Sequence, residues 1–130
     1  MSLFEKLKGT SLEGFTPLGK KHKVEQLEII DTIVGDGDEV QELATITAHY
    51  TGALAATGII FESSYDSRNP ATFGLHQVID GWTKGVPGMK VGGTRRLVIP
   101  AAMAYGHRRA SSSIPPNSDL VFDIELVAIK

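Results

Sequence analysis

The sequence predicts an α+β fold in which a curved antiparallel β-sheet of five to six strands wraps around one short α-helix. Most of the chain after residue 23 consists of short apolar segments, β-branched or alternating, separated by turn residues, which is typical of antiparallel strands. Only one segment has apolar residues at clear helical spacing. We therefore expect the sheet to curl around this helix, whose apolar face fills the concave side.

Length and composition favour one ordinary globular domain, since the chain has 130 residues and 42% of them are hydrophobic. The net charge of −2 gives no electrostatic reason to expect nucleic acid or an anionic membrane as a partner. No apolar run approaches the roughly 20 residues needed to cross a bilayer. The first residues lack the apolar stretch of a signal peptide. A cytoplasmic protein is the resulting expectation, with a signal or anchor removed from before residue 1 as the open alternative. A monomer is the default expectation.

Residues 1–23 differ from the rest of the chain, because their apolar residues are loosely spaced and five lysines lie among them. We expect an N-terminal extension here, either flexible or with one short helix near residues 3–8. The folded domain is expected to occupy residues 24–130.

The strands are expected in the following order along the chain. Residues 27–34 form a β-branched run that stops at the turn 35–38. Residues 44–51 alternate, with Ala44, Ile46, Ala48 and Tyr50 on one face of the strand. Shorter strands are expected at 59–62, 71–75 and 94–99, the last ended by Pro100, and the longest at 120–129.

The helix is predicted from four apolar residues that recur at steps of three and four, namely Ile79, Trp82, Val86 and Met89. Glycine or proline at positions 85, 87 and 88 limits its length, so we expect about two turns beginning near residues 77–79.

Several kinds of chemistry are disfavoured by the residues present. The chain has no cysteine, and its four histidines are too far apart in sequence to suggest a metal site. No nucleophile or phosphate-binding motif is present, and the carboxylates at 36–39 fit a solvated turn. The arginine pairs at 95–96 and 108–109 are expected to be solvated. We therefore expect neither a metal nor a cofactor.

An unusual set of aromatic residues remains, on or beside elements expected to face the same concavity: Tyr50, Phe61, Phe73, Trp82, Tyr105 and Phe122. A lone aromatic residue on a strand is more often part of a core than of a binding site. Taken by themselves, these residues leave both interpretations open.

Six short motifs occur in order and with compatible spacing: His49-Tyr50-Thr51-Gly52, Phe61-Glu62-Ser63-Ser64, Gln77-Val78-Ile79-Asp80-Gly81-Trp82, Ala104-Tyr105-Gly106, Ile114-Pro115-Pro116-Asn117 and Leu120-Val121-Phe122-Asp123-Ile124-Glu125-Leu126. Together they resemble the FKBP-type peptidyl-prolyl cis/trans isomerases, the family that binds macrolide immunosuppressants. The resemblance covers about residues 24–130. It implies noncovalent catalysis of rotation about Xaa-Pro bonds in protein folding. It also implies proline-containing polypeptides and macrolides of the tacrolimus or rapamycin type as partners.

The resemblance further implies a role for individual residues. Trp82 corresponds to the floor on which the substrate proline ring rests. The walls and rim correspond to Tyr50, Phe61, Phe122, Phe73 and Val78.

Two hydrogen-bond donors to substrate carbonyls are also implied, the backbone N–H of Ile79 and the hydroxyl of Tyr105. Ile114 corresponds to an apolar contact at the end of the loop that overhangs the pocket. Glu62 stands where many members carry aspartate. We expect its longer side chain still to form a hydrogen bond with Tyr50. Ala71 replaces an aromatic residue of some members and leaves that side more open. The overhanging loop at 107–113 is polar and basic.

Rotation about a peptide bond meets a barrier of roughly 18–20 kcal/mol set by C–N resonance. The twisted amide has lost this resonance and is less polar, so an apolar pocket favours it over the planar ground state. The leading hypothesis is therefore an enzyme that needs no nucleophile. A module that holds proline-containing segments without turnover is the second hypothesis, and an aromatic core with no binding role is the third.

Overall fold

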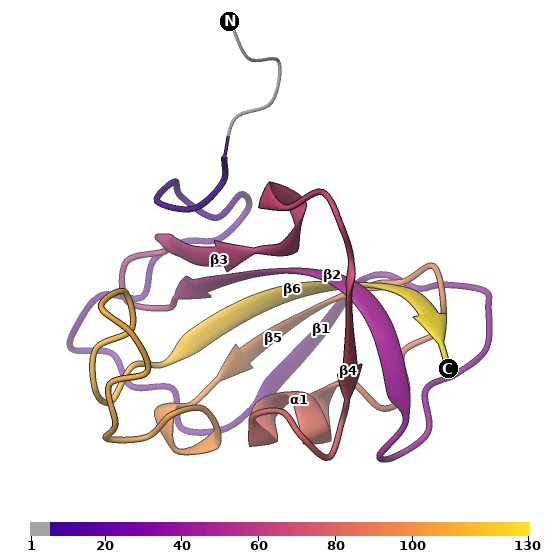
Figure 1. Ribbon diagram of the computed structural model, residues 1–130. Helices are drawn as coiled ribbons and strands as arrows, with labels where there is room; N and C mark the ends of the chain where they lie inside the picture. Colours follow the sequence, from indigo (N-terminus) through magenta and orange to yellow (C-terminus); the bar gives the residue numbers. More distant parts are fainter. Residues whose placement is uncertain (1–5) are drawn as a thin grey trace, which may run out of the picture.

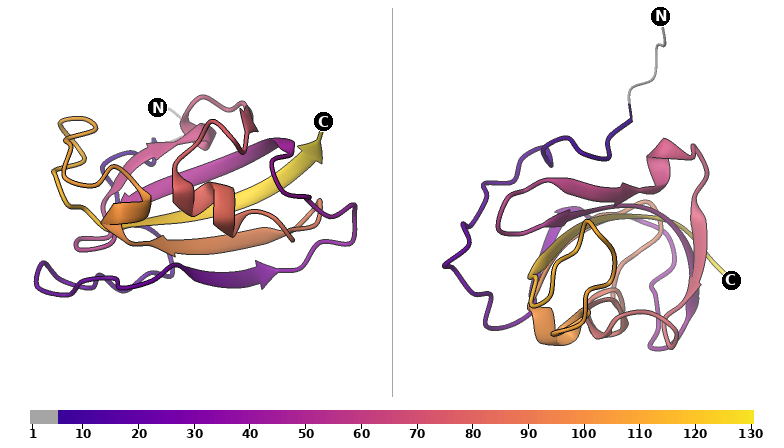
Figure 2. Two further views of the ribbon diagram at one scale, coloured as in Figure 1. Left: turned by 90° about the horizontal axis from the view of Figure 1, so that it is seen from below. Right: turned by 60° about the vertical axis from the view of Figure 1, so that its left-hand side comes forward.

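A computed structural model describes residues 6–130, which form a six-stranded antiparallel sheet curved around one short helix (Figures 1 and 2). The elements in chain order are β1 (Glu28–Ile33), β2 (Thr45–Leu54), β3 (Ile60–Ser63), the 3₁₀ turn η1 (Ser64–Asp66), β4 (Ala71–Gly74), α1 (Asp80–Gly85), β5 (Thr94–Ile99), the 3₁₀ turn η2 (Ala101–Met103) and β6 (Leu120–Ile129). The predicted fold class is confirmed. None of the helices in residues 6–130 is long and apolar enough to span a membrane.

The strand order is β1-β5-β6-β2-β3, and β4 also pairs with β2. Strand β2 is long enough to hold two strands on the same edge, since β4 pairs with its residues 45–48 and β3 with its residues 51–53. Residues 49 and 50 lie between these two ladders and pair only with β6, on the other edge of β2. This break in the pairing lies at Tyr50, one of the predicted site residues.

The main core fills the space between α1 and the concave face of the sheet (Figure 2). Glycines let the helix lie close to β5, because a Cβ added to Gly81 would come within 2.6 Å of Ile99 and one added to Gly85 within 2.8 Å of Leu97. The helix begins at Asp80, later than predicted, and it ends at Gly85 because Pro87 and Gly88 follow.

The N-terminal extension packs against the convex face of the sheet (Figures 1 and 2). Leu12 is buried there beside Ile60 and Val98, with Phe15 packed against the same cluster. Residues 6–23 contain no helix. The helix expected near residues 3–8 lies partly outside the described residues, and its described part is irregular. The loose spacing of the apolar residues reflects an irregular chain that follows a sheet surface.

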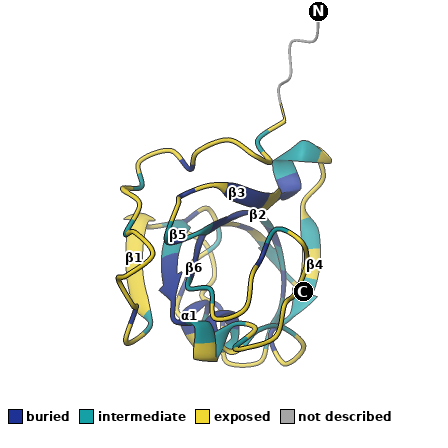
Figure 3. Ribbon diagram, turned by 90° about the vertical axis from the view of Figure 1, so that its left-hand side faces the viewer, coloured by how far each residue is buried: buried dark blue, intermediate teal, exposed yellow. Residues whose placement is uncertain are grey.

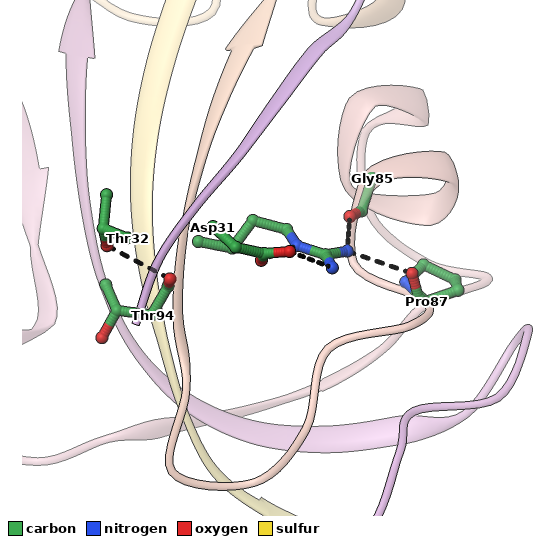
Figure 4. A network of polar contacts seen from close by, with 6 residues as sticks. Asp31, Thr32, Gly85, Pro87 and Thr94 are labelled. Atoms are coloured by element: carbon green, nitrogen blue, oxygen red, sulfur yellow. Dashed lines mark hydrogen bonds and ion pairs between the residues drawn. The ribbon is translucent and has the colours of Figure 1, made fainter. Parts of the chain in front are cut away.

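Arg95 ties the edge strand β1 to β5 and to the end of α1 (Figure 4). Its guanidinium donates to the Asp31 carboxylate at 2.6 and 3.1 Å and to the carbonyls of Gly85 at 2.8 Å and Pro87 at 3.1 Å. These contacts hold in place a strand whose residues are all exposed (Figure 3). They also hold the pKa of Asp31 below its ordinary value.

The prediction of solvated arginines at positions 95 and 96 was wrong. Arg95 is only 8% exposed, and Arg96 donates to Asp123 at 2.7 Å. Arg96 also donates to the carbonyls of Glu13 and Gly14, so it fixes the N-terminal extension to β5. Partners distant in sequence explain why two neighbouring charged residues are withdrawn from water.

Candidate active site

Nine of the ten predicted site residues line one cavity of about 690 Å³: Tyr50, Phe61, Glu62, Phe73, Val78, Ile79, Trp82, Tyr105 and Phe122. This volume falls in the range of small-molecule binding sites. The residues come from β2, β3, β4, the start of α1, the segment after η2, and β6. The curvature of the sheet around α1 is what brings such distant segments to one place.

The tenth residue, Ile114, does not line this cavity. It is 6% exposed and lines a second cavity of about 580 Å³, which shares Phe61, Glu62 and Tyr105 with the first. Five further residues line the first cavity and were not predicted as site residues: Gln77, Asp80, Ala102, Ala104 and Arg108. Gln77, Asp80 and Ala104 lie within the quoted motifs, and Arg108 lies in the basic loop. Their positions in the sequence could therefore have identified them as cavity residues. Nothing in the sequence distinguishes Ala102.

Trp82 forms the base of an interlocked set of rings. It is 4% exposed, and three rings meet it edge-to-face: Phe73 with centroids 5.0 Å apart, Phe122 at 5.4 Å and Tyr50 at 5.6 Å. Edge-to-face geometry is favourable for aromatic pairs and adds to the free energy of burial. Each ring therefore restrains the others, and the cavity has a rigid apolar base.

Gly52 makes room for the wall formed by Phe61 and Phe122, whose ring centroids lie 5.7 Å apart at 86°. A Cβ added to Gly52 would come within 2.6 Å of Phe122 Cε1 and 2.7 Å of Phe61 Cζ. Only glycine at this position of β2 allows the two rings to lie so close to the strand.

The side chain of Ser64 bridges the break in β2 pairing at Tyr50. Ser64 Oγ accepts a hydrogen bond from the Tyr50 N–H at 2.7 Å and lies 2.8 Å from His49 Nδ1. It also donates to the Tyr50 carbonyl at 3.3 Å. A buried hydroxyl thus takes the place of a neighbouring strand and fixes the backbone that carries the Tyr50 ring.

Three polar groups at the cavity can donate hydrogen bonds to a ligand. The pKa of the Tyr50 phenol is raised to about 12, chiefly by burial and then by the negative charge of the nearby Glu62 carboxylate. The pKa of Tyr105 is raised by burial and by the charge of Glu62. The backbone N–H of Ile79, at the N-cap of α1, has no acceptor among residues 6–130. Two protonated phenols and a free N–H are thus available to a bound ligand.

Comparison with known proteins supplies the family. The sequence profile described as FKBP-type peptidyl-prolyl cis-trans isomerase matches residues 37–127. The peptidyl-prolyl cis-trans isomerase FPR2 of Saccharomyces cerevisiae is 49% identical over 87 residues, which are 65% of this chain and 64% of that relative. An FK506-binding protein of Neisseria meningitidis serogroup A is 47% identical over 105 residues, 79% of this chain and 95% of the relative.

A solved structure agrees with these relatives. The crystal structure of AtFKBP13 superposes with a TM-score of 0.72 and 41% identity, covering 80% of this chain and 93% of that one. Fold, cavity and relatives together define the class of protein as a peptidyl-prolyl cis-trans isomerase. The chain belongs to the FKBP-type family of these enzymes. The family and activity predicted from the ordered motifs are confirmed.

Proposed function

We propose that the 690 Å³ cavity is where this domain binds the proline of a polypeptide and accelerates rotation about the preceding peptide bond. The observation that supports this most directly is the buried Trp82 ring with three aromatic rings edge-on around it. A proline ring resting on Trp82 lies between apolar walls, next to Tyr50, Phe61 and Phe122.

The mechanism follows from the polarity of the amide. A planar Xaa-Pro amide is strongly polar, whereas the twisted amide has lost C–N resonance and is more readily moved out of water. The apolar cavity therefore stabilises the transition state more than the ground state, which is what raises kcat. The Tyr105 hydroxyl and the Ile79 N–H hold the flanking carbonyls while the bond turns. Val78 and Phe73 complete the apolar surround, and Ile114 lines the adjoining cavity.

Macrolides of the tacrolimus or rapamycin type are proposed to occupy the same cavity and to compete with polypeptide substrates. The relative from Neisseria meningitidis is named an FK506-binding protein, which supports this proposal. The cavity volume of about 690 Å³ suits the insertion of part of such a ligand.

The decisive measurement is cis/trans exchange of a short Xaa-Pro peptide by NMR, with and without the protein. Uncatalysed exchange takes tens of seconds or more, so acceleration by the enzyme is easily resolved. Tyr105→Phe is expected to lower kcat/KM several-fold. Tyr65→Phe is the matched control, because the Tyr65 phenol donates to Glu125 at 2.6 Å and does not line the cavity.

The outcomes separate the two functional hypotheses. Acceleration that a macrolide abolishes supports the proposed enzyme site. Binding of peptide or macrolide with no acceleration at near-stoichiometric protein selects the module that binds without turnover. Equal effects of Tyr105→Phe and Tyr65→Phe would remove Tyr105 from the site.

Three further expectations stay predictions. The domain division between residues 1–23 and 24–130 can be tested by limited proteolysis, the monomeric state by sedimentation, and the cytoplasmic location by fractionation. Packing of Leu12 in the convex cluster supports a domain that includes part of the extension.

A further inference from the structure

The proline-binding cavity continues into a second one. The cavity of about 580 Å³ shares Phe61, Glu62 and Tyr105 with the cavity of about 690 Å³. Its other walls include Lys6 and Lys8 from the N-terminal extension and Ser111 from the overhanging loop. A polypeptide held with its proline on Trp82 would therefore reach the two lysines by extending past Tyr105 into the adjoining cavity.

The extension is fixed in this position by backbone contacts. The N–H groups of Leu7 and Lys8 donate to Asp66 Oδ1 at 2.7 Å and Oδ2 at 3.0 Å. The Gly9 N–H donates to the Ile60 carbonyl at 2.8 Å, and the Ile60 N–H donates to the Thr10 carbonyl at 2.8 Å. The segment thus lies along β3 and η1, as Figure 1 shows. Lys6 and Lys8 therefore lie in a fixed wall of the 580 Å³ cavity, which we call the groove.

The groove holds two lysine side chains, Lys6 and Lys8, that can bind an anionic group of a ligand. Neither lysine forms an ion pair with another residue of the part of the chain that the structure describes. The same wall also holds two carboxylates: Asp66, which accepts two backbone N–H groups, and Glu62. Because no carboxylate of residues 6–130 lies within ion-pair distance of either lysine, both ammonium groups are available to an anionic group of a ligand.

We propose that Lys6 and Lys8 form a subsite that binds an acidic side chain of the polypeptide substrate, within a few residues of its proline. An extended chain rises about 3.3 Å per residue, so an adjoining cavity is reached in two or three residues. The proposal rests on the proposed function of the neighbouring cavity, and it assigns the N-terminal extension a role in substrate selection.

The test compares peptides that differ only by Glu, Gln or Lys at each position within three residues of one proline. At low ionic strength the best Glu peptide is expected to have kcat/KM about two to five times that of its Gln counterpart, the size of an exposed ion-pair contribution. The double variant Lys6→Gln/Lys8→Gln brings this ratio to about one. Lys20→Gln/Lys23→Gln is the matched control, since it removes the same charge from a different cavity.

A second variant tests placement against general charge. Asp66→Ala removes a negative charge from the groove and also the acceptor that fixes Leu7 and Lys8. Loss of preference for the Glu peptide supports the built subsite, whereas a stronger preference would contradict it. An equal loss in both lysine double variants would also overturn the proposal, because net charge alone would explain it.

The proposed function and this inference fail separately. If the neutral peptide is not isomerised, the proposed function fails, and Trp82 fluorescence titrations with the Glu and Gln peptides still measure the subsite. If the neutral peptide is isomerised with no Glu preference at any position, only the subsite is refuted.

Discussion

Replacing Ser64 by alanine tests whether one buried hydroxyl holds the Tyr50 wall in place. The change removes the acceptor of the Tyr50 N–H and the partner of His49 Nδ1, at 2.7 and 2.8 Å. Because β2 has no neighbouring strand at this point of that edge, no other backbone group replaces the lost contacts. Tyr50 is then free to move relative to Trp82.

The expected loss can be worked from these contacts. Each hydrogen bond contributes about 0.5–1.5 kcal/mol net, and leaving a partly buried N–H unpaired adds a desolvation cost of about 1–3 kcal/mol in the limit of full burial. We expect a loss of about 2 kcal/mol in the free energy of unfolding. A domain of this size has about 5–15 kcal/mol, so the variant stays folded. Displacement of the ring is expected to lower kcat/KM about fivefold, equivalent to about 1 kcal/mol of transition-state binding.

Urea unfolding and peptide isomerisation measure the two effects, with Ser63→Ala as control. Ser63 is also buried, and its hydroxyl forms a hydrogen bond with Thr51 Oγ1 at 2.8 Å and accepts one from the Tyr65 N–H at 3.3 Å, but none joins it to Tyr50. The control should lose about 1 kcal/mol of stability and keep its activity. If Ser64→Ala changes stability by less than about 0.5 kcal/mol, or if both variants lose activity equally, the hydroxyl does not position Tyr50.

Two other predictions concern the cavity wall and the edge strand. Gly52→Ala adds a methyl group against Phe61 and Phe122, so we expect a loss of about 1–3 kcal/mol by thermal unfolding and weaker macrolide binding; unchanged affinity would show that the rings yield at no cost. Asp31 has its pKa lowered chiefly by hydrogen bonds from Arg95, so its ion pair stabilises the protein above the ordinary pKa of 3.8 and is lost as the pH falls through the lowered value. Stability should therefore fall more steeply below about pH 4 in the wild type than in Asp31→Asn, and parallel acid curves would contradict this.

Most strands of the sheet could be predicted from the sequence, because their residue patterns end at proline or at turn residues. Strand β5 matches the predicted residues 94–99, which end at Pro100, and β6 matches 120–129. The helix was less accurate, since Val86 and Met89 continue its apolar period and are buried beyond its end. The apolar period predicts which residues are buried, whereas Pro87 and Gly88 determine where the helix ends.

Features that depend on distant partners could not be predicted from local pattern. The burial of Arg95 requires Asp31, 64 residues away, and the placement of Lys8 requires Asp66, 58 residues away. The gathering of the aromatic residues in one cavity likewise follows from the curvature of the sheet. It was predicted only through the order of the motifs, which is why Ile114 was assigned to the same cavity although it lines the adjoining one.

The last prediction concerns the pKa of the Tyr50 phenol and the effect of Glu62 on it. The pKa of Tyr50 is raised to about 12, first by burial and then by Glu62, so the phenol stays protonated and isomerisation should be independent of pH up to about 10. Glu62→Gln removes the negative charge and should lower this pKa, but burial keeps it above the ordinary value of 10.0. Glu125→Gln is the control, since Glu125 raises the pKa of Tyr65 instead. NMR titration of the tyrosine rings separates the two effects. A Tyr50 pKa that responds to Glu125→Gln and not to Glu62→Gln would mean that Glu62 is turned away from the cavity.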